Sequence, residues 1–162
     1  MIEPRDDDVP HEHDKRRHFV EVVRTLALLS AGTLDLNTER VCIIGPPRSG
    51  KTTLASTMTN VRHTDDLIGI LDWSAASEHV ADEWLMSPGP WVIEGVAVVR
   101  ALRKWLASHS NGKRCDRVIV MTQTHVELSK GQAAKAKGHE KIWQEVRPLL
   151  LARGVAIEER SA

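Results

Sequence analysis

The chain has 162 residues, which suits one compact domain whose core needs no disulfide or metal support. Its 22 Lys and Arg balance its 22 Asp and Glu, which argues against a wholly basic nucleic-acid binder and against an acidic disordered chain. No apolar run approaches the roughly 18 residues of a membrane span, and Cys42 and Cys115 are far apart, so we expect reduced thiols in a cytoplasmic protein with no membrane partner.

The predicted elements alternate between helix and strand. Residues 1–11 are acidic and polar and predict a flexible tail, and apolar residues at helical spacing predict a helix over 12–31. Short apolar runs predict strands over 40–44, 61–63, 91–94, 117–121 and 155–157. Helices are expected over 50–60, 77–86, 98–108 and 140–152. This order indicates one α/β domain over 12–162, with a mainly parallel sheet flanked by helices.

A phosphate-loop motif follows the strand predicted over 40–44. The segment Gly45-Pro46-Pro47-Arg48-Ser49-Gly50-Lys51-Thr52-Thr53 fits G-x-x-x-x-G-K-[ST], and it has the strand before it and the helix after it that the motif requires. Glycines let the backbone wrap around phosphates, and the helix start adds partial positive charge. We expect Lys51 to reach the β- and γ-phosphates of a nucleotide and Thr52 to offer its hydroxyl to Mg²⁺.

With this motif, the chain resembles the small P-loop kinases of nucleosides, nucleoside monophosphates and related small molecules, a pattern common in bacteriophage genomes. The resemblance covers about residues 40–158, where the motif is specific and the remainder is order and spacing. It implies the P-loop NTPase fold, with about five strands in a mainly parallel sheet, a mobile lid over the phosphates, and bound ATP with Mg²⁺. The residues do not decide between ATP and GTP as the donor.

Carboxylates follow two of the predicted strands. The apolar strand 91–94 ends in Glu94, which resembles the carboxylate that orders Mg²⁺ or its waters in such kinases. Asp65 and Asp66 follow the strand 61–63, and the resemblance implies that one of them holds the acceptor hydroxyl or accepts its proton. Asp65 is slightly preferred. The structural alternatives are a strand that merely ends in a surface glutamate and an aspartate pair in a turn or helix cap.

Basic residues gather in the second half of the chain. Residues 1–99 hold 9 Lys and Arg against 16 Asp and Glu, whereas residues 100–147 hold 11 against 4. Solvated helix faces explain this excess more simply than a polyphosphate or nucleic-acid site does. Arg100 and Arg103 lie one helical turn apart, which favours either an anion clamp on the acceptor side or a solvated face.

The resemblance puts the lid at about 122–139, where the candidate phosphate contacts are Lys130, Lys135 and Lys137. Nucleoside-monophosphate kinases usually close this lid with arginines, and this segment contains none. Lysines supply charge without planar, bidentate recognition, so the chain departs here from a standard monophosphate kinase.

The sequence therefore predicts an ATP-dependent kinase that transfers the γ-phosphoryl group to a hydroxyl or phosphate of a nucleoside- or nucleotide-type acceptor. A specific variant is DNA modification at 5-hydroxymethyluracil in phage DNA, bound through the basic second half. The alternative is a P-loop ATPase acting with a protein or nucleic-acid partner, which turns over without an acceptor. A third possibility is a regulator that binds nucleotide without turnover. An oligomer is compatible with all three.

Overall fold

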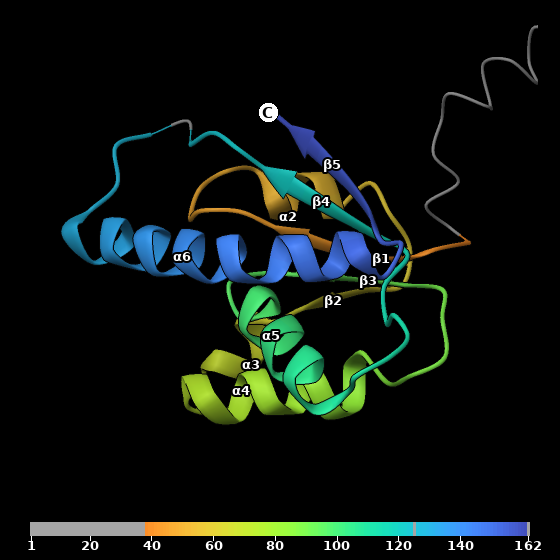
Figure 1. Ribbon diagram of the computed structural model, residues 1–162. Helices are drawn as coiled ribbons and strands as arrows, with labels where there is room; N and C mark the ends of the chain where they lie inside the picture. The colour runs from red at the N-terminus through yellow and green to blue at the C-terminus, as the bar shows by residue number, and fades with distance from the viewer. Residues whose placement is uncertain (1–37, 125, 162) are drawn as a thin grey trace, which may run out of the picture. The chain divides into compact units, whose positions relative to one another are not determined.

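Five parallel strands form the centre of the fold in the computed structural model, which describes residues 38–124 and 126–161. The strands are β1 (Arg40–Ile44), β2 (Val61–His63), β3 (Trp91–Glu94), β4 (Arg117–Met121) and β5 (Ala156–Arg160). They lie in the order β2-β3-β1-β4-β5 (Figure 1), and every neighbouring pair is parallel. The predicted α/β class with a mainly parallel sheet is therefore confirmed. The tail predicted over 1–11 and the helix predicted over 12–31 lie outside the described residues.

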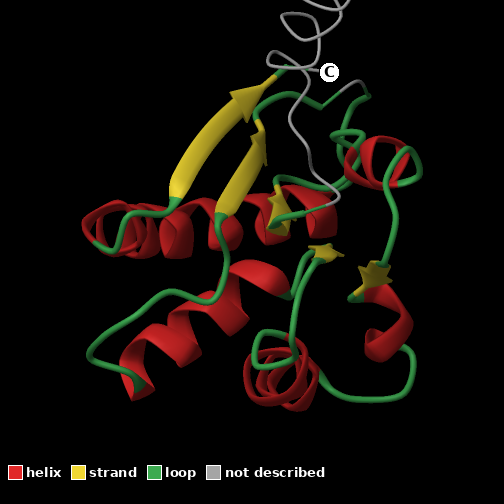
Figure 2. Ribbon diagram, turned by 90° about the vertical axis from the view of Figure 1, so that its right-hand side faces the viewer, coloured by secondary structure: helices red, strands yellow, loops and turns green. Residues whose placement is uncertain are grey.

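Helices lie on both sides of this sheet (Figure 2). They are α2 (Lys51–Ala55), α3 (Asp65–Ile68), α4 (Trp73–His79) with the π-helical turn η1 (Val80–Trp84), α5 (Val98–Ser108) and α6 (Lys130–Ala152). The predicted bounds of α5 match. The helix predicted over 50–60 is shorter in the structure. It ends at Ala55, and turns follow it.

Two helices begin earlier than their apolar spacing predicts. The helix predicted over 77–86 begins at Trp73, because the side chain of Asp72 accepts a hydrogen bond from the Ala75 N–H at 2.8 Å and caps the helix. The helix predicted over 140–152 begins at Lys130, where Ser129 and Gln132 form a capping box. Residues 130–139 of the segment predicted as a lid over 122–139 are therefore the first turns of α6.

Alternating side chains of the strands enter two cores. One face, which includes Cys42, Ile44 and Ile93, packs against buried apolar residues of α5 and α6 such as Leu102 and Val146. The other face packs against α2, with Val41, Ile43, Val92, Ile119, Met121 and Ala55 buried together. Burial on both faces explains why the three central strands, β3, β1 and β4, are nearly continuous apolar runs in the sequence. The outer strands β2 and β5 are partly exposed and more polar. Within the described ranges, no helix is both long and apolar enough to cross a lipid bilayer.

The strand order determines where a ligand site can form. β1 lies between β3 and β4, and its register places Ile43 beside Glu94. The chain moves from β1 out to β2, returns to β3, and then crosses β1 to reach β4. Ligands of open parallel sheets bind beyond the carboxyl ends of the strands, where the strand order reverses. At this point the sequence places the glycine-rich loop 45–52.

Candidate functional site

The loop between β1 and α2 bends back on itself through residues with positive φ. Arg48 has a φ of 58° and Gly50 a φ of 83°, both in the left-handed region. Such conformations turn successive backbone N–H groups toward one side, which makes a concave surface suited to anions. Gly45 is required for a different reason, because a Cβ atom there would lie 2.6 Å from the Met121 carbonyl oxygen. The loop is thus pressed closely against the end of β4.

Lys51 begins α2, and its side chain turns back into the concave side of the loop. Its Nζ donates to the Pro46 carbonyl oxygen at 2.7 Å and lies 3.4 Å from the Oγ of the fully buried Ser49. Burial lowers the pKa of Lys51, while the charges of Glu94 and Asp65 act in the opposite direction. The loop therefore holds a buried ammonium group with two carboxylates in its field.

Glu94 lies at the end of β3 and is only 2% exposed. Its Oε1 accepts a hydrogen bond from Thr52 Oγ1 at 3.2 Å and lies 2.6 Å from His63 Nδ1. An ionised carboxylate only accepts, so the second contact requires a proton on Nδ1. Because β2 and β3 end side by side at the sheet edge where α2 begins, the three side chains converge although they are distant in sequence. The resulting cluster supplies hydroxyl and carboxylate oxygens to the floor of a cleft.

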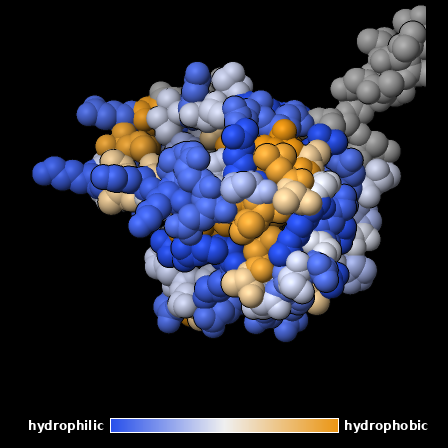
Figure 3. Space-filling view, in the orientation of Figure 1, coloured by the Kyte–Doolittle hydropathy of each residue, from blue (hydrophilic) through white to orange (hydrophobic). Residues whose placement is uncertain are grey.

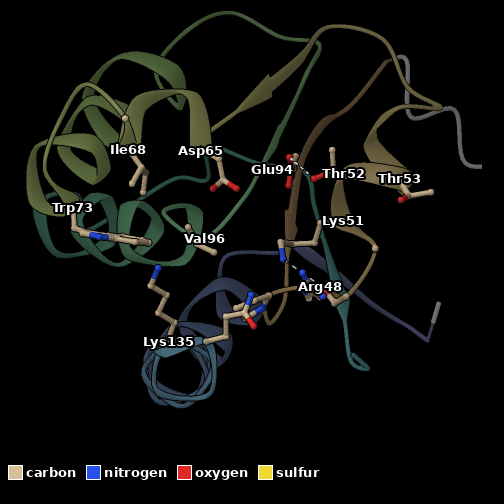
Figure 4. A pocket seen from close by; sticks show the side chains of 15 residues that line it. Arg48, Lys51, Thr52, Thr53, Asp65, Ile68, Trp73, Glu94, Val96 and Lys135 are labelled. Atoms are coloured by element: carbon tan, nitrogen blue, oxygen red, sulfur yellow. Dashed lines mark hydrogen bonds between the residues drawn. The ribbon is translucent and has the colours of Figure 1, made fainter. Parts of the chain in front are cut away.

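A main cleft of ≈ 760 Å³ opens over this floor (Figure 4). Its first wall is the loop, through Pro47, Arg48, Ser49, Gly50, Lys51, Thr52 and Thr53. Asp65 of α3 faces Lys51 from the other side, and Trp73 of α4 and Val96 add apolar surface. Lys135 and Gln132 reach the cleft from α6, and Lys135 Nζ lies 5.1 Å from the centre of the Trp73 ring. This cation–π contact joins α6 to α4 across the cleft.

Two smaller hollows adjoin the main cleft. The side pocket, of ≈ 220 Å³, is bounded by Trp73, Val96, Val99, Arg100, Lys135 and His139, together with Gly45 and Pro47. A third hollow, of ≈ 420 Å³, lies between α6 and the ends of β4 and β5 and includes Pro46, Lys137 and Arg147. Both begin at the loop, so the loop is the common wall of all three spaces.

His139 lies between the side pocket and the third hollow. Burial first, and then the positive charges of Lys51 and Arg100, lower its pKa to about 4, against the opposing effect of Glu140. The imidazole is therefore neutral at pH 7. Its Nε2 is buried and has no hydrogen-bond partner among the described residues. A buried polar atom left in this way costs about 1–3 kcal/mol, so it requires an explanation.

The structure brings together most of the residues proposed from the sequence. Lys51, Thr52, Glu94, Asp65 and Lys135 all contribute to the main cleft. Asp66 contributes to none of the three spaces described, so geometry separates the two aspartates that the sequence left open. Lys137 lies in the third hollow, and Lys130, at the first position of α6, lies outside all three.

The two arginines of α5 do not form the clamp that their spacing favours. Arg100 borders the side pocket, whereas Arg103 Nη1 lies 3.4 Å from Glu145 Oε2 on α6, with both side chains nearly half exposed. Arg103 is therefore directed to a surface ion pair on the neighbouring helix. Of these two arginines, Arg100 is the one that borders a space open to a ligand.

Sequence reasoning missed two histidines. His63 ends β2 beside the end of β3, and the shared edge of two parallel strands could have indicated it. His139 had no such signal, because it falls inside a helix whose early start was not predicted. A scan of protein-family models found no match to the chain, and a search of curated protein sequences found no relative. The chemistry of the site therefore carries the functional proposal.

Proposed function

We propose that the protein is an ATP-dependent P-loop phosphotransferase, a kinase that acts on a nucleoside- or nucleotide-type acceptor. The observation that carries the proposal is the main cleft, where a buried lysine, a hydroxyl–carboxylate pair and a separate carboxylate face one another. Each group meets one requirement of phosphoryl transfer. The lysine places positive charge beside the phosphates, the hydroxyl–carboxylate pair supplies oxygen ligands for a metal ion, and the separate carboxylate supplies a base for the acceptor.

The donor occupies the loop side of the cleft in this proposal. Backbone N–H groups of 48–52, after the two prolines, hold the phosphates, and the ammonium group of Lys51 leaves the Pro46 carbonyl to bind the β- and γ-phosphates. Burial supports this role, because a charge in a water-poor site acts more strongly on developing phosphate charge than one in solvent. Arg48, which also borders the cleft, adds a second cation on this side.

The donor set of the cleft fits Mg²⁺. Mg²⁺ takes oxygen ligands, usually from one or two protein groups, with waters and phosphates completing its shell. Thr52 Oγ1 and Glu94 Oε1 are such oxygens. When bound, the ion would neutralise charge on the phosphate oxygens.

Asp65 acts on the acceptor side. Its carboxylate hydrogen-bonds the acceptor hydroxyl and takes its proton as the oxygen attacks the γ-phosphorus. A new P–O bond forms to the acceptor, the bond from the γ-phosphorus to the β,γ-bridging oxygen breaks, and ADP leaves with that electron pair. Lys135, which borders the same cleft from α6, balances charge on the group in transfer, and Lys137 and Lys130 extend the basic surface of that helix.

An aromatic and cationic acceptor side favours a nucleotide-type substrate. Trp73 supplies an aromatic wall, and Arg100 and Lys135 supply charge beside it. The start of α6 carries Lys130, Lys135 and Lys137, and Figure 3 shows hydrophilic side chains projecting at that end of the molecule. Such a basic surface suits a polyanion such as DNA that carries 5-hydroxymethyluracil. That phage substrate is the specific variant of the proposal.

Transfer of ³²P from [γ-³²P]ATP in the presence of Mg²⁺ tests the proposal. The acceptors are nucleosides, nucleoside monophosphates, and DNA with and without 5-hydroxymethyluracil. Label on one of these acceptors supports the kinase and names its substrate class. Free phosphate without a labelled acceptor would instead favour an ATPase that acts with a partner, and nucleotide binding without turnover would favour a regulator.

A further inference from the structure

The side pocket has the size and walls of a site for a single ring. At ≈ 220 Å³ it is smaller than the 300–1,000 Å³ typical of pockets for drug-sized ligands, so it cannot hold a whole nucleotide. Its walls include the aromatic ring of Trp73 and the aliphatic side chains of Val96 and Val99. Flat apolar walls of this kind suit a planar ring better than a flexible polyol.

His139, which borders this pocket, has one polar atom without a partner among the described residues. This atom is Nε2, and it is buried. The imidazole is neutral at pH 7, because burial and the nearby cations lower its pKa to about 4. A neutral imidazole nitrogen carries either an N–H or a lone pair, so it can pair with an acceptor or a donor on the amide-like edge of a heteroaromatic ring.

The charges of the pocket lie beside this polar atom. Arg100 borders the pocket and forms no ion pair among the described residues, in contrast to Arg103 on the same helix, which is paired with Glu145. Lys135 contributes a second cation on the side nearest Trp73. A ligand that satisfies all of these groups combines an uncharged polar ring with a separate anionic group.

We propose that the side pocket binds an uncharged heteroaromatic ring of the size of a pyrimidine base, with His139 Nε2 as its hydrogen-bonding partner and Arg100 beside the anion attached to it. The inference rests on the proposed function, because it makes this ring part of the acceptor. Trp73, Val96 and Lys135 border both the pocket and the main cleft, so a substituent on the ring reaches toward Asp65. His139 is thus assigned as a specificity residue.

Calorimetric titration of the full chain tests the proposal with three matched probes. These are thymidine 5′-monophosphate, abasic deoxyribose 5-phosphate, and the difluorotoluene analogue of thymidine monophosphate, which keeps the ring shape without its hydrogen bonds. A short single-stranded oligothymidylate shows whether the ring is bound better free or within a strand. We expect thymidine monophosphate to bind at least ~10-fold more tightly than the abasic probe.

Variants of His139 separate hydrogen bonding from shape. His139→Leu should weaken thymidine monophosphate about 10-fold and leave the difluorotoluene analogue unchanged, while His139→Gln should restore most of the affinity. His79→Leu is the matched control, because His79 borders none of the three spaces described. The inference would be overturned if His139→Leu lost affinity equally for thymidine monophosphate and for the difluorotoluene analogue. It would also be overturned if the wild-type protein bound neither ring probe more tightly than the abasic probe.

Binding of a non-hydrolysable ATP analogue, measured on the same samples, distinguishes two kinds of failure. If the analogue binds and no ring probe does, the pocket inference is wrong and the proposed kinase stands. If the analogue does not bind either, the proposed function itself fails.

Discussion

Glu94 Oε1 has two hydrogen-bonding neighbours. Thr52 Oγ1 lies 3.2 Å from it, and His63 Nδ1 lies 2.6 Å from it. Burying a carboxylate is costly unless hydrogen bonds or charges compensate, and here Lys51 adds an opposite charge. Thr52 and Glu94 would lose their fixed relative position if either hydrogen bond were removed. At the residue scale, the site is therefore a set of groups that hold one another in place.

His63 should act by positioning Glu94. His63→Ala removes the Nδ1 contact, and we expect the rate to fall about 10- to 100-fold, with a higher Mg²⁺ requirement, as for other residues that orient metal ligands. His63→Asn keeps a donor and should retain most of the activity. Steady-state rates across a Mg²⁺ series measure this. Equal losses in both variants would point to packing instead.

Asp65 and Asp66 form a matched pair for testing the acceptor base. Asp65 borders the main cleft and Asp66 does not, although they are adjacent in α3. Asp65→Asn should reduce kcat by about 10²- to 10⁴-fold, and Asp66→Asn should leave it within ~2-fold. Single-turnover transfer assays measure the difference. A full rate in Asp65→Asn would remove this carboxylate from the mechanism.

At the element scale, the end of β3 must approach α3 closely. Gly95 has a φ of +126°, and a Cβ atom there would lie 2.1 Å from Thr64 Oγ1. Gly95→Ala should therefore lower the free energy of unfolding by ~3 kcal/mol or more, because strain and overlap add. Gly112→Ala is the control, since Gly112 has a φ of +80° and open space, and should cost about 1 kcal/mol. Urea denaturation compares them, and equal costs would contradict the role of close approach.

At the amino ends of the strands, Arg40 of β1 forms an ion pair with Asp116, which precedes β4. The Arg40 backbone N–H, Nε and Nη2 donate to the Asp116 carboxylate at 3.0, 3.0 and 2.9 Å, and Arg40 lowers the pKa of Asp116 to about 2. A depressed pKa gives stability that is present above the unfolded value near 3.8 and is lost as the pH falls through about 2.

Asp116→Asn tests this ion pair. We expect it to lower the free energy of unfolding by roughly 2 kcal/mol at pH 7, with a difference from the wild type that narrows below pH 4. Denaturant titrations at pH 7, 4 and 3 measure the difference. A cost that is the same at all three pH values would show that charge is not its cause.

At the scale of the whole molecule, central strands were easier to predict than helices. Buried parallel strands are continuous apolar runs, so Arg40–Ile44 and Arg117–Met121 match their predictions. The strand predicted over 155–157 is Ala156–Arg160 instead, because its polar, partly exposed end carries no apolar signal. The early turns of α6 are polar and exposed, and their start depends on the Ser129–Gln132 cap and not on periodicity. His139 and the separation of Arg100 from Arg103 depend on packing between helices, which spacing along one chain does not contain.

Transfer of the γ-phosphoryl group by Lys51→Ala, compared with the wild type and Lys141→Ala, tests whether the loop lysine acts on the phosphates of the donor. Lys51 borders the main cleft, whereas Lys141 is exposed on α6 and borders none of the three spaces described. The account predicts loss of transfer in Lys51→Ala, with circular dichroism unchanged, and wild-type transfer in Lys141→Ala. Wild-type transfer by a correctly folded Lys51→Ala variant would contradict it.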